Sequence, residues 1–159
     1  MILKVNDCFP SVSFYQLIDG GPKLVNSNDL FNKKKIILVG VPGAFTPTCH
    51  NDHLPGYIKN YEKFRHKGID EVFFVSSNDP FVMSSWVNSL GTTDINHLSD
   101  CLNEFRDSSG LKIDLTSVGL GNRLSRFAIL IDNGLIKNIY DEKGGGLEIS
   151  KAENVLSNL

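Results

Sequence analysis

The sequence predicts an α/β fold in which helices flank a central mixed sheet and a β-hairpin stands at the N-terminal end. Two apolar runs, 36–39 and 71–76, are typical of buried strands, and a segment with helical periodicity separates them. This alternation favours parallel strands in the middle of one sheet. A late hairpin, 126–131 and 135–140 around Asp132-Asn133-Gly134, would add antiparallel strands at one side.

The first elements are expected to be short. Residues 12–17 alternate and contain aromatic side chains, and Asp19-Gly20-Gly21 then marks a turn before a second strand at 23–25. The segment 27–31 predicts a short helical turn whose first or second residue is the N-cap. These elements precede the first buried strand.

Two longer helices lie between the buried strands and after them. The helix after Cys49 should end near Lys67-Gly68, because glycine supplies the left-handed cap there. The next helix should start at Asp79-Pro80, since proline suits the first helical position. Its expected apolar residues are Phe81, Val82, Trp86 and Leu90.

The rest of the chain predicts small elements. We expect a short strand at 97–100, a helix at 102–106 and a C-terminal helix at 149–159, preceded by a flexible connection at 144–146. No repeat, low-complexity segment or linker divides the sequence. The 159 residues are therefore expected to form one domain, 1–159.

Composition excludes several classes of function. The formal net charge is −2, which gives no electrostatic reason to expect a nucleic acid or membrane partner. No apolar run approaches the roughly 20 residues that span a bilayer. The N-terminus lacks the basic and apolar regions of a signal peptide. We expect a cytoplasmic protein, or an organellar one if a leader is removed.

The three cysteines, Cys8, Cys49 and Cys101, are too few and too irregular for a secreted disulfide framework. No Cys-x-x-Cys pair occurs and the histidines are scattered, so no zinc site is expected. The sequence also lacks a glycine-rich nucleotide motif, which predicts no bound cofactor. A reducing compartment fits this cysteine usage.

Cys49 stands where a strand has ended and a helix begins. Such a position faces unpaired backbone N–H groups and the positive end of the helix dipole, which favour a thiolate. Pro42, Gly43, Thr46 and Pro47 would hold a tight loop around the sulfur. The alternative is a buried, inert cysteine, the commoner fate of single cysteines. The loop and the helix start favour a reactive thiol.

The pattern Pro42-x-x-x-Thr46-x-x-Cys49 is similar to the active-site signature of peroxiredoxins, and the longer string 40–49 resembles the atypical, Prx5-like or type II branch. The likeness continues in further strings along nearly the whole chain: 53–56, 78–82, 121–127 and 146 onward. The resemblance implies one peroxiredoxin (redoxin) domain with the thioredoxin-like fold.

The resemblance also implies a catalytic set. Cys49 would be the peroxidatic cysteine, whose thiolate attacks a peroxide oxygen and becomes a sulfenic acid. Thr46 would hydrogen-bond the thiolate and the peroxide, and Pro42 would shield the pocket. Arg126 would hold both the thiolate and the leaving oxygen. Arg123 is the competing arginine, expected to be exposed, and a surface ion pair is the alternative role for Arg126.

The same likeness places four residues in the substrate pocket: Gly43, Phe45, Thr48 and His53. For His53 a packing role and a catalytic contribution are equally open. The other histidines are expected at the surface: His50, His66 and His97.

The sequence departs from the family in its resolving cysteine. Ile149 stands where Prx5-like enzymes often carry that cysteine, and Phe74 occupies the position used by plant-like type II enzymes. Cys101 matches no resolving position, so a structural or side role is favoured over resolution, and Cys8 is expected to be structural. The hypothesis is a one-cysteine peroxiredoxin.

The resemblance thus predicts a thiol-dependent peroxidase that reduces hydrogen peroxide and organic hydroperoxides, with peroxynitrite as a further candidate. Its reductant would be glutathione with glutaredoxin, or thioredoxin, and it would act in antioxidant defence and cell redox homeostasis. A homodimer is expected from the family. The alternative is a non-catalytic redox sensor or chaperone-like protein that uses the same cysteine.

Overall fold

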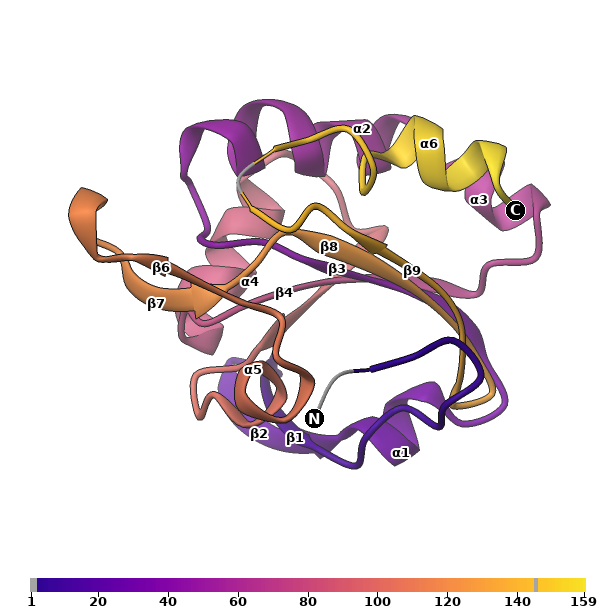
Figure 1. Cartoon of the computed structure of the whole chain (residues 1–159), viewed down its shortest axis with the longest axis horizontal. Coiled ribbons are helices and arrows are strands. Elements are labelled where there is room, and N and C mark those ends of the chain that lie inside the picture. The colour runs from indigo at the N-terminus through magenta and orange to yellow at the C-terminus, as the bar shows by residue number, and fades with distance from the viewer. Residues whose placement is uncertain (1–2, 145) are drawn as a thin grey trace.

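The computed structural model describes residues 3–144 and 146–159, and Gly145 within the expected flexible connection lies outside that range. A seven-stranded mixed sheet in the order β2-β1-β5-β4-β3-β8-β9 forms the middle of the molecule (Figure 1). Its strands are β1 (Ser13–Ile18), β2 (Gly21–Asn26), β3 (Lys35–Gly40), β4 (Glu71–Ser76), β5 (Ile95–Ser99), β8 (Phe127–Asp132) and β9 (Leu135–Asp141).

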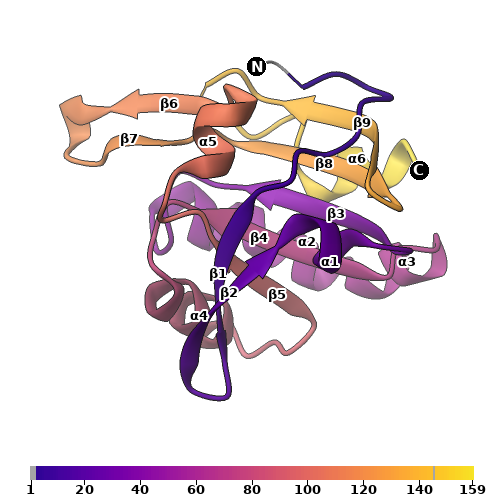
Figure 2. The same ribbon diagram turned by 90° about the horizontal axis from the view of Figure 1, so that it is seen from below.

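Helices cover both faces of this sheet. In Figure 1, α2, α3 and α6 lie above it and α1 and α5 below it, and Figure 2 shows the same arrangement from below. The helices are α1 (Ser27–Phe31), α2 (Leu54–Lys59), α3 (Tyr61–His66), α4 (Pro80–Ser89), α5 (Glu104–Ser109) and α6 (Ala152–Ser157). The predicted α/β class with a central mixed sheet is confirmed.

The strand pairing follows the predicted layout. β3, β4 and β5 are parallel neighbours in the centre, and β8 pairs antiparallel with β3 and with β9. The turn between β8 and β9 contains Asn133 and Gly134, both with positive φ (49° and 78°), as a two-residue hairpin turn requires. The N-terminal hairpin β1–β2 is also present and joins the sheet through β5.

The alternation of β3 divides the core into two layers. Ile37 and Val39 face a layer shared with α2, α3, α4 and α6. Ile36 and Leu38 face the opposite layer, which is rich in phenylalanines from α1, α5 and the N-terminal segment. Because successive strand side chains point to opposite faces, one short apolar run supports both layers.

Gly40 ends β3 where no side chain could fit. It lies opposite Phe127 in the β3–β8 register, and a Cβ at Gly40 would stand 2.0 Å from a carbon of the Phe127 ring. The ring is fully buried, so it has no free space into which it could move. The glycine therefore lets β8, and the Arg126 that precedes it, approach the start of the Cys49 loop.

The helices near the ends of strands differ from the predictions. The N-cap of α1 is Asn26, because the hydroxyl of Ser27 donates to Pro10 O at 2.8 Å instead. The segment after Cys49 is not one helix: a π-helical turn (Cys49–His53) leads into α2, and the chain breaks at Asn60 before α3. The end of α3 at Lys67 and Gly68, with φ of +90° at Gly68, is as predicted.

The start of α4 is confirmed, since Asp79 caps it by accepting from Val82 N at 2.9 Å and Pro80 is its first residue. Its expected apolar face is partly wrong because Phe81 is 55% exposed. The fully packed residues of α4 are Met83, Trp86 and Val87.

Two further boundaries and one missed hairpin are corrections. α5 is Glu104–Ser109 rather than 102–106, and α6 is Ala152–Ser157 rather than 149–159. A two-stranded hairpin, β6 (Lys112–Leu115) and β7 (Gly121–Leu124) joined through a 3₁₀ turn (Thr116–Val118), was not predicted. Its strands are only four residues long and partly exposed, so their alternation is too short to distinguish from a loop.

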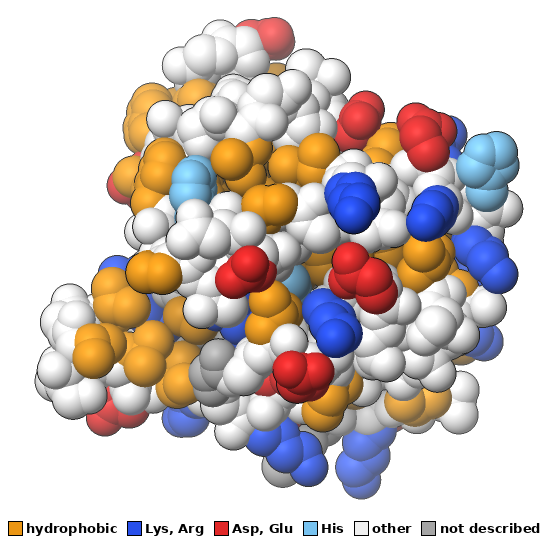
Figure 3. All heavy atoms as spheres, turned by 90° about the horizontal axis from the view of Figure 1, so that it is seen from above, with side chains coloured by type: hydrophobic (Ala, Val, Ile, Leu, Met, Phe, Trp, Pro, Cys, Tyr) orange, Lys and Arg blue, Asp and Glu red, His pale blue; other side chains and the backbone are white. Residues whose placement is uncertain are grey.

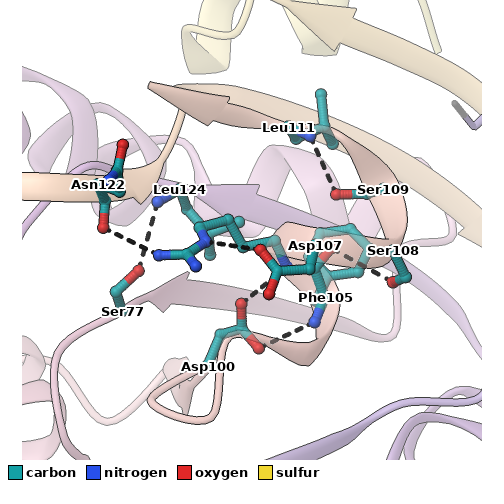
Figure 4. Close-up of polar contacts among 10 residues, drawn as sticks. Ser77, Asp100, Phe105, Asp107, Ser108, Ser109, Leu111, Asn122 and Leu124 are labelled. Atoms are coloured by element: carbon teal, nitrogen blue, oxygen red, sulfur yellow. Dashed lines mark hydrogen bonds and ion pairs between the residues drawn. The ribbon is translucent and has the colours of Figure 1, made fainter. Parts of the chain in front are cut away.

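Asp100 joins the end of β5 to the start of α5, as Figure 4 shows. Its buried carboxylate accepts from Phe105 N at 3.0 Å and Arg106 N at 2.9 Å. Arg106 in turn donates to Asn122 O at 3.1 Å in β7. Burial raises the pKa of Asp100 from 3.8 to about 6, against the two backbone hydrogen bonds, which lower it.

This raised pKa predicts a pH-dependent stability. The folded protein binds the Asp100 proton more tightly than the unfolded chain does, so the contribution of Asp100 to the free energy of unfolding should fall as pH rises from about 4 to about 6 and then level off. The pKa difference corresponds to at most about 3 kcal/mol. The lowered pKa of His53 contributes a slope of the opposite sign, so the test is a comparison of two proteins. Urea unfolding across this range should give Asp100→Asn a more positive pH slope than the parent, because the variant lacks the falling contribution of Asp100. The exposed N-cap variant Asp79→Asn is the control and should keep the parent slope. An unchanged slope in Asp100→Asn would contradict the assignment.

Candidate active site

The loop after β3 closes over itself before Cys49. Pro42 and Gly43 are buried, and the Thr46 hydroxyl donates to Gly43 O at 2.7 Å. Phe45 has a φ of +63°, which is a strained conformation for a bulky side chain. The Thr46 hydroxyl donates its hydrogen to Gly43 O, so it does not donate to the sulfur as expected. Its oxygen can still accept hydrogen bonds.

Two residues from other elements brace this loop. Arg123 donates to Pro42 O at 3.2 Å and to Leu120 O at 2.8 Å. The side-chain oxygen of Asn78 accepts from Ala44 N at 2.9 Å. Arg123 was expected to be exposed, and this was wrong, because its side chain is half-buried against the loop. Asn78 was missed as a site residue, although it lies only two residues after the end of the buried parallel strand β4.

Cys49 and Arg126 meet at the centre of the site. Arg126 precedes β8, and its Nη2 donates to Cys49 Sγ at 3.2 Å. The two residues are 0% and 3% exposed. Among the residues that the structure describes, no carboxylate pairs with Arg126. A buried cation without an acidic partner favours an anion beside it, and the neighbouring sulfur can become one.

His53 lies behind Arg126 and not in an open pocket. Its Nδ1 is 2.9 Å from Arg126 Nη1, and its Nε2 is 3.2 Å from Ser150 O. Burial, followed by the nearby Arg126 charge, lowers the pKa of His53 to about 3, so the ring is neutral at physiological pH. Its ring also packs edge-on against Tyr57 and Phe74. The packing role and the contact with the arginine therefore occur together.

The remaining expected pocket residues lie around this centre. Gly43 is buried, and a Cβ there would stand 3.1 Å from Thr46 and 3.3 Å from Arg123. Thr48 is half-buried directly before the π turn, and Phe45 is 50% exposed. Phe45 thus faces the outside of the loop more than the sulfur.

Two of the histidines expected at the surface are partly buried instead. His50 accepts a hydrogen bond from Trp86 Nε1 at 3.1 Å, which ties the π turn to α4. His97 accepts from Leu17 N at 3.0 Å and joins β5 to β1. His66 is exposed as predicted. Spacing alone did not indicate these partners because they come from distant segments.

All three cysteines are free thiols. Cys101 follows β5, and the loop that carries Cys49 follows β3. Because β4 lies between these two strands, β5 and β3 are about 10 Å apart. A disulfide needs Cα atoms within about 7 Å.

Cys8 has an exposed side chain, contrary to the expected structural role, and its backbone pairs with Leu135. Phe74 is fully buried and Ile149 is 46% exposed.

Within residues 3–144 and 146–159, no group of three or more histidine, cysteine or acidic side chains is placed to hold a metal ion. No helix in these ranges has both the length and the apolar character to cross a membrane.

A mixed sheet of this topology, with a buried cysteine–arginine pair beyond the end of β3, is typical of a thioredoxin-like protein. Residues 4–156 match the family model described as Redoxin. Peroxiredoxin-2C of Oryza sativa subsp. japonica is 44% identical over 144 residues, which are 89% of each chain. The chain belongs to the Redoxin family and is a peroxiredoxin, a thiol-dependent peroxidase.

Solved structures agree with this assignment. Reduced Prx3 of Vibrio vulnificus, in complex with hydrogen peroxide, is similar with a TM-score of 0.94 and 36% identity, and 99% of each chain is covered. The antioxidant protein (1-Cys peroxiredoxin) of Plasmodium falciparum has a TM-score of 0.93 and 30% identity, with 99% of this chain and 100% of that chain covered. The predicted family and thioredoxin-like fold are confirmed.

Proposed function

We propose that Cys49 is the residue that reduces the peroxide and that Arg126 stabilises negative charge throughout the reaction. The observation that carries this proposal is the 3.2 Å contact between Arg126 Nη2 and Cys49 Sγ in a buried setting. In such a setting a guanidinium favours the thiolate over the thiol and stabilises an oxyanion more strongly than it would in water.

The reaction conserves atoms and electrons in one displacement. The Cys49 thiolate attacks the hydroxyl oxygen of a hydroperoxide, an S–O bond forms and the O–O bond breaks. The leaving oxygen departs as an alkoxide or hydroxide and takes a proton to become an alcohol or water. The sulfur is oxidised to sulfenic acid while the peroxide is reduced.

Thr46 and Pro42 would orient and shelter the peroxide. The Thr46 hydroxyl donates to Gly43 O at 2.7 Å, so it is available as an acceptor for the peroxide O–H. The Pro42 carbonyl accepts a hydrogen bond from Arg123 at 3.2 Å, which restrains the backbone of Pro42. Gly43 leaves room for this approach because a side chain there would crowd Thr46.

The proposed substrates are hydrogen peroxide and organic hydroperoxides, with peroxynitrite as a further one. The related Vibrio vulnificus Prx3 was solved with hydrogen peroxide bound, which supports the smallest of these substrates. The proposed chemistry uses no bound cofactor or metal, because the cysteine sulfur itself accepts the oxygen and an external thiol supplies the electrons.

The proposed recycling uses one cysteine of this chain and a thiol from outside. Cys101 is about two strands away from the β3 end of the site, and the similar Plasmodium falciparum protein is named a 1-Cys peroxiredoxin. Cys49 is 0% exposed, so an external thiol reaches its sulfenic acid only after the π turn Cys49–His53 unwinds. Glutathione with glutaredoxin, or thioredoxin, is the proposed donor.

A homodimer is the proposed assembly. The exposed large hydrophobic side chains of the described residues include Phe45 (50%), Phe81 (55%) and Val118 (67%). Figure 3 shows hydrophobic side chains gathered on the side of the molecule where the β6–β7 hairpin projects. Phe45 is held out by a strained backbone that costs about 1 kcal/mol or more, which supports a use for its exposed ring.

The proposed location is a reducing compartment, either the cytoplasm or an organelle. Three free cysteines, one of them exposed, support this proposal because thiols persist where glutathione and thioredoxin keep them reduced.

The test is steady-state peroxide consumption with glutathione plus glutaredoxin, or with thioredoxin, as the only electron source. The matched variant is Cys8→Ser/Cys101→Ser, which leaves Cys49 as the only thiol. We expect it to turn over within about threefold of the parent, since neither residue touches the site. Turnover that stops in this variant would overturn the one-cysteine cycle. A parent that oxidises once and stalls with every donor would favour the redox-sensor alternative.

A further inference from the structure

The segment after β9 folds back onto the active site, next to α2 (Figure 1). Its buried Ser150 provides a backbone carbonyl that accepts from the Tyr57 hydroxyl at 2.7 Å and lies 3.2 Å from His53 Nε2. These contacts join residues more than ninety positions apart in the sequence. The carboxyl-terminal part of the chain is therefore in direct contact with the histidine behind Arg126.

The two neighbours of His53 demand one tautomer of its ring. A carbonyl oxygen can only accept, so the Nε2 that faces Ser150 must carry the hydrogen. The ring is neutral because its pKa is lowered to about 3, so Nδ1 then has a free lone pair. That lone pair accepts from Arg126 Nη1 at 2.9 Å. In the other tautomer, two N–H groups would point at each other.

Glu142 accepts the hydrogen of the Ser150 hydroxyl, a group that could otherwise donate to His53 Nε2 and favour the other tautomer. The Ser150 hydroxyl lies 3.5 Å from His53 Nε2 and could donate to it, but its hydrogen goes to Glu142 Oε2 at 2.7 Å. The same carboxylate accepts from Ser150 N at 2.6 Å and Glu148 N at 3.1 Å. Burial acts to raise the pKa of Glu142, but these hydrogen bonds together hold it below its ordinary value, so the group stays ionised.

The contacts form a closed ring. The backbone N–H of Glu142 donates to Arg126 O at 3.2 Å, so the carboxylate is anchored to the same residue whose guanidinium meets the sulfur. From Glu142 the path runs through Ser150 and His53 to Arg126 and ends at Cys49 Sγ. Each group in the path orients the next one.

We propose that Glu142 and Ser150 are positioning residues that set the tautomer of His53 and thereby aim Arg126 at the sulfur of Cys49. This inference rests on the proposed roles of Cys49 and Arg126. It extends the active site to the carboxyl-terminal segment, and it gives a specific task to an acidic residue that does not touch the substrate.

The central test is Glu142→Gln, which keeps the shape of the side chain. The hydrogen bonds from Ser150 converge on Oε2, so the amide oxygen can keep them only with the amide NH2 turned toward the N–H of Glu148, and it accepts them without the strength that the negative charge gives. The Ser150 hydroxyl is therefore held less tightly and can donate to His53 in part of the molecules. We expect the rate constant for peroxide to fall by about tenfold, as for other partners that orient a functional histidine. The control Glu148→Gln changes an exposed carboxylate of the same segment and should leave this rate unchanged.

The second readout is the tautomer itself, observed by ¹⁵N–¹H correlation spectra of the His53 ring. The parent should show hydrogen on Nε2 alone, and Glu142→Gln should show both tautomers. A merely structural role for Glu142 would not move this signal. Tyr57→Phe also loosens Ser150 but leaves the Glu142 contact in place, so it should keep the parent tautomer.

The outcomes separate this inference from the catalytic proposal. Parent-like rate or parent-like tautomer in Glu142→Gln would overturn the positioning role. If that variant does not fold, the unaltered protein still decides, because hydrogen on Nδ1 of His53 would overturn the proposal. If peroxide reduction does not depend on Cys49 or Arg126, the proposed catalytic roles fail, while the tautomer spectra still report on the Glu142 contact.

Discussion

Cys49→Ser is expected to reduce peroxide consumption to the uncatalysed background. The reaction ends with oxygen bonded to the reactive atom, and sulfur can be oxidised in this way whereas a serine oxygen cannot. Serine is also almost un-ionised at neutral pH, so no comparable nucleophile forms even next to Arg126. The substitution replaces one buried atom by a smaller one, and the fold should survive.

This result is best measured as a single turnover. Trp86 is the only tryptophan, and its hydrogen bond to His50 connects it to the π turn, so its fluorescence should report changes at Cys49. We expect a rapid fluorescence change on mixing the parent with peroxide and none in Cys49→Ser. Cys101→Ser is the matched control and should behave as the parent. Retained peroxide reduction in Cys49→Ser would refute the assignment of Cys49.

Arg126→Met is expected to slow the reaction with peroxide by about 10²–10³-fold, the usual cost of removing one donor to a developing oxyanion. Methionine preserves most of the length and the apolar stem but removes the positive charge beside Cys49 Sγ. The variant leaves His53 Nδ1 without its donor, which adds a modest cost in stability.

The control for this variant is Arg65→Met, at an exposed arginine near the end of α3 that donates to Ile69 O and Asp70 O. Its peroxide rate should stay at the parent value. Second-order rate constants at several pH values give the comparison, with thermal unfolding to verify that both variants are folded. An Arg126→Met rate within threefold of the parent would show that the guanidinium is not needed.

Much of the fold could be predicted because its signals are local. The apolar run of β3, the Asn133-Gly134 turn and the proline after Asp79 each act through neighbouring residues. The loop signature that contains Cys49 is also contiguous, so it can be recognised from the amino-acid sequence alone. The β6–β7 hairpin was missed because its strands are too short for a clear period.

The sequence by itself thus determined the α/β class, the family and the candidate cysteine. Only the tertiary structure decided what surrounds the sulfur. Arg123 and Arg126 are three residues apart, yet one braces Pro42 and the other meets Cys49. The contacts of Arg126, His53 and Ser150 span 73 to 97 residues of chain. Such contacts depend on how whole elements pack, and no periodicity along the chain encodes them.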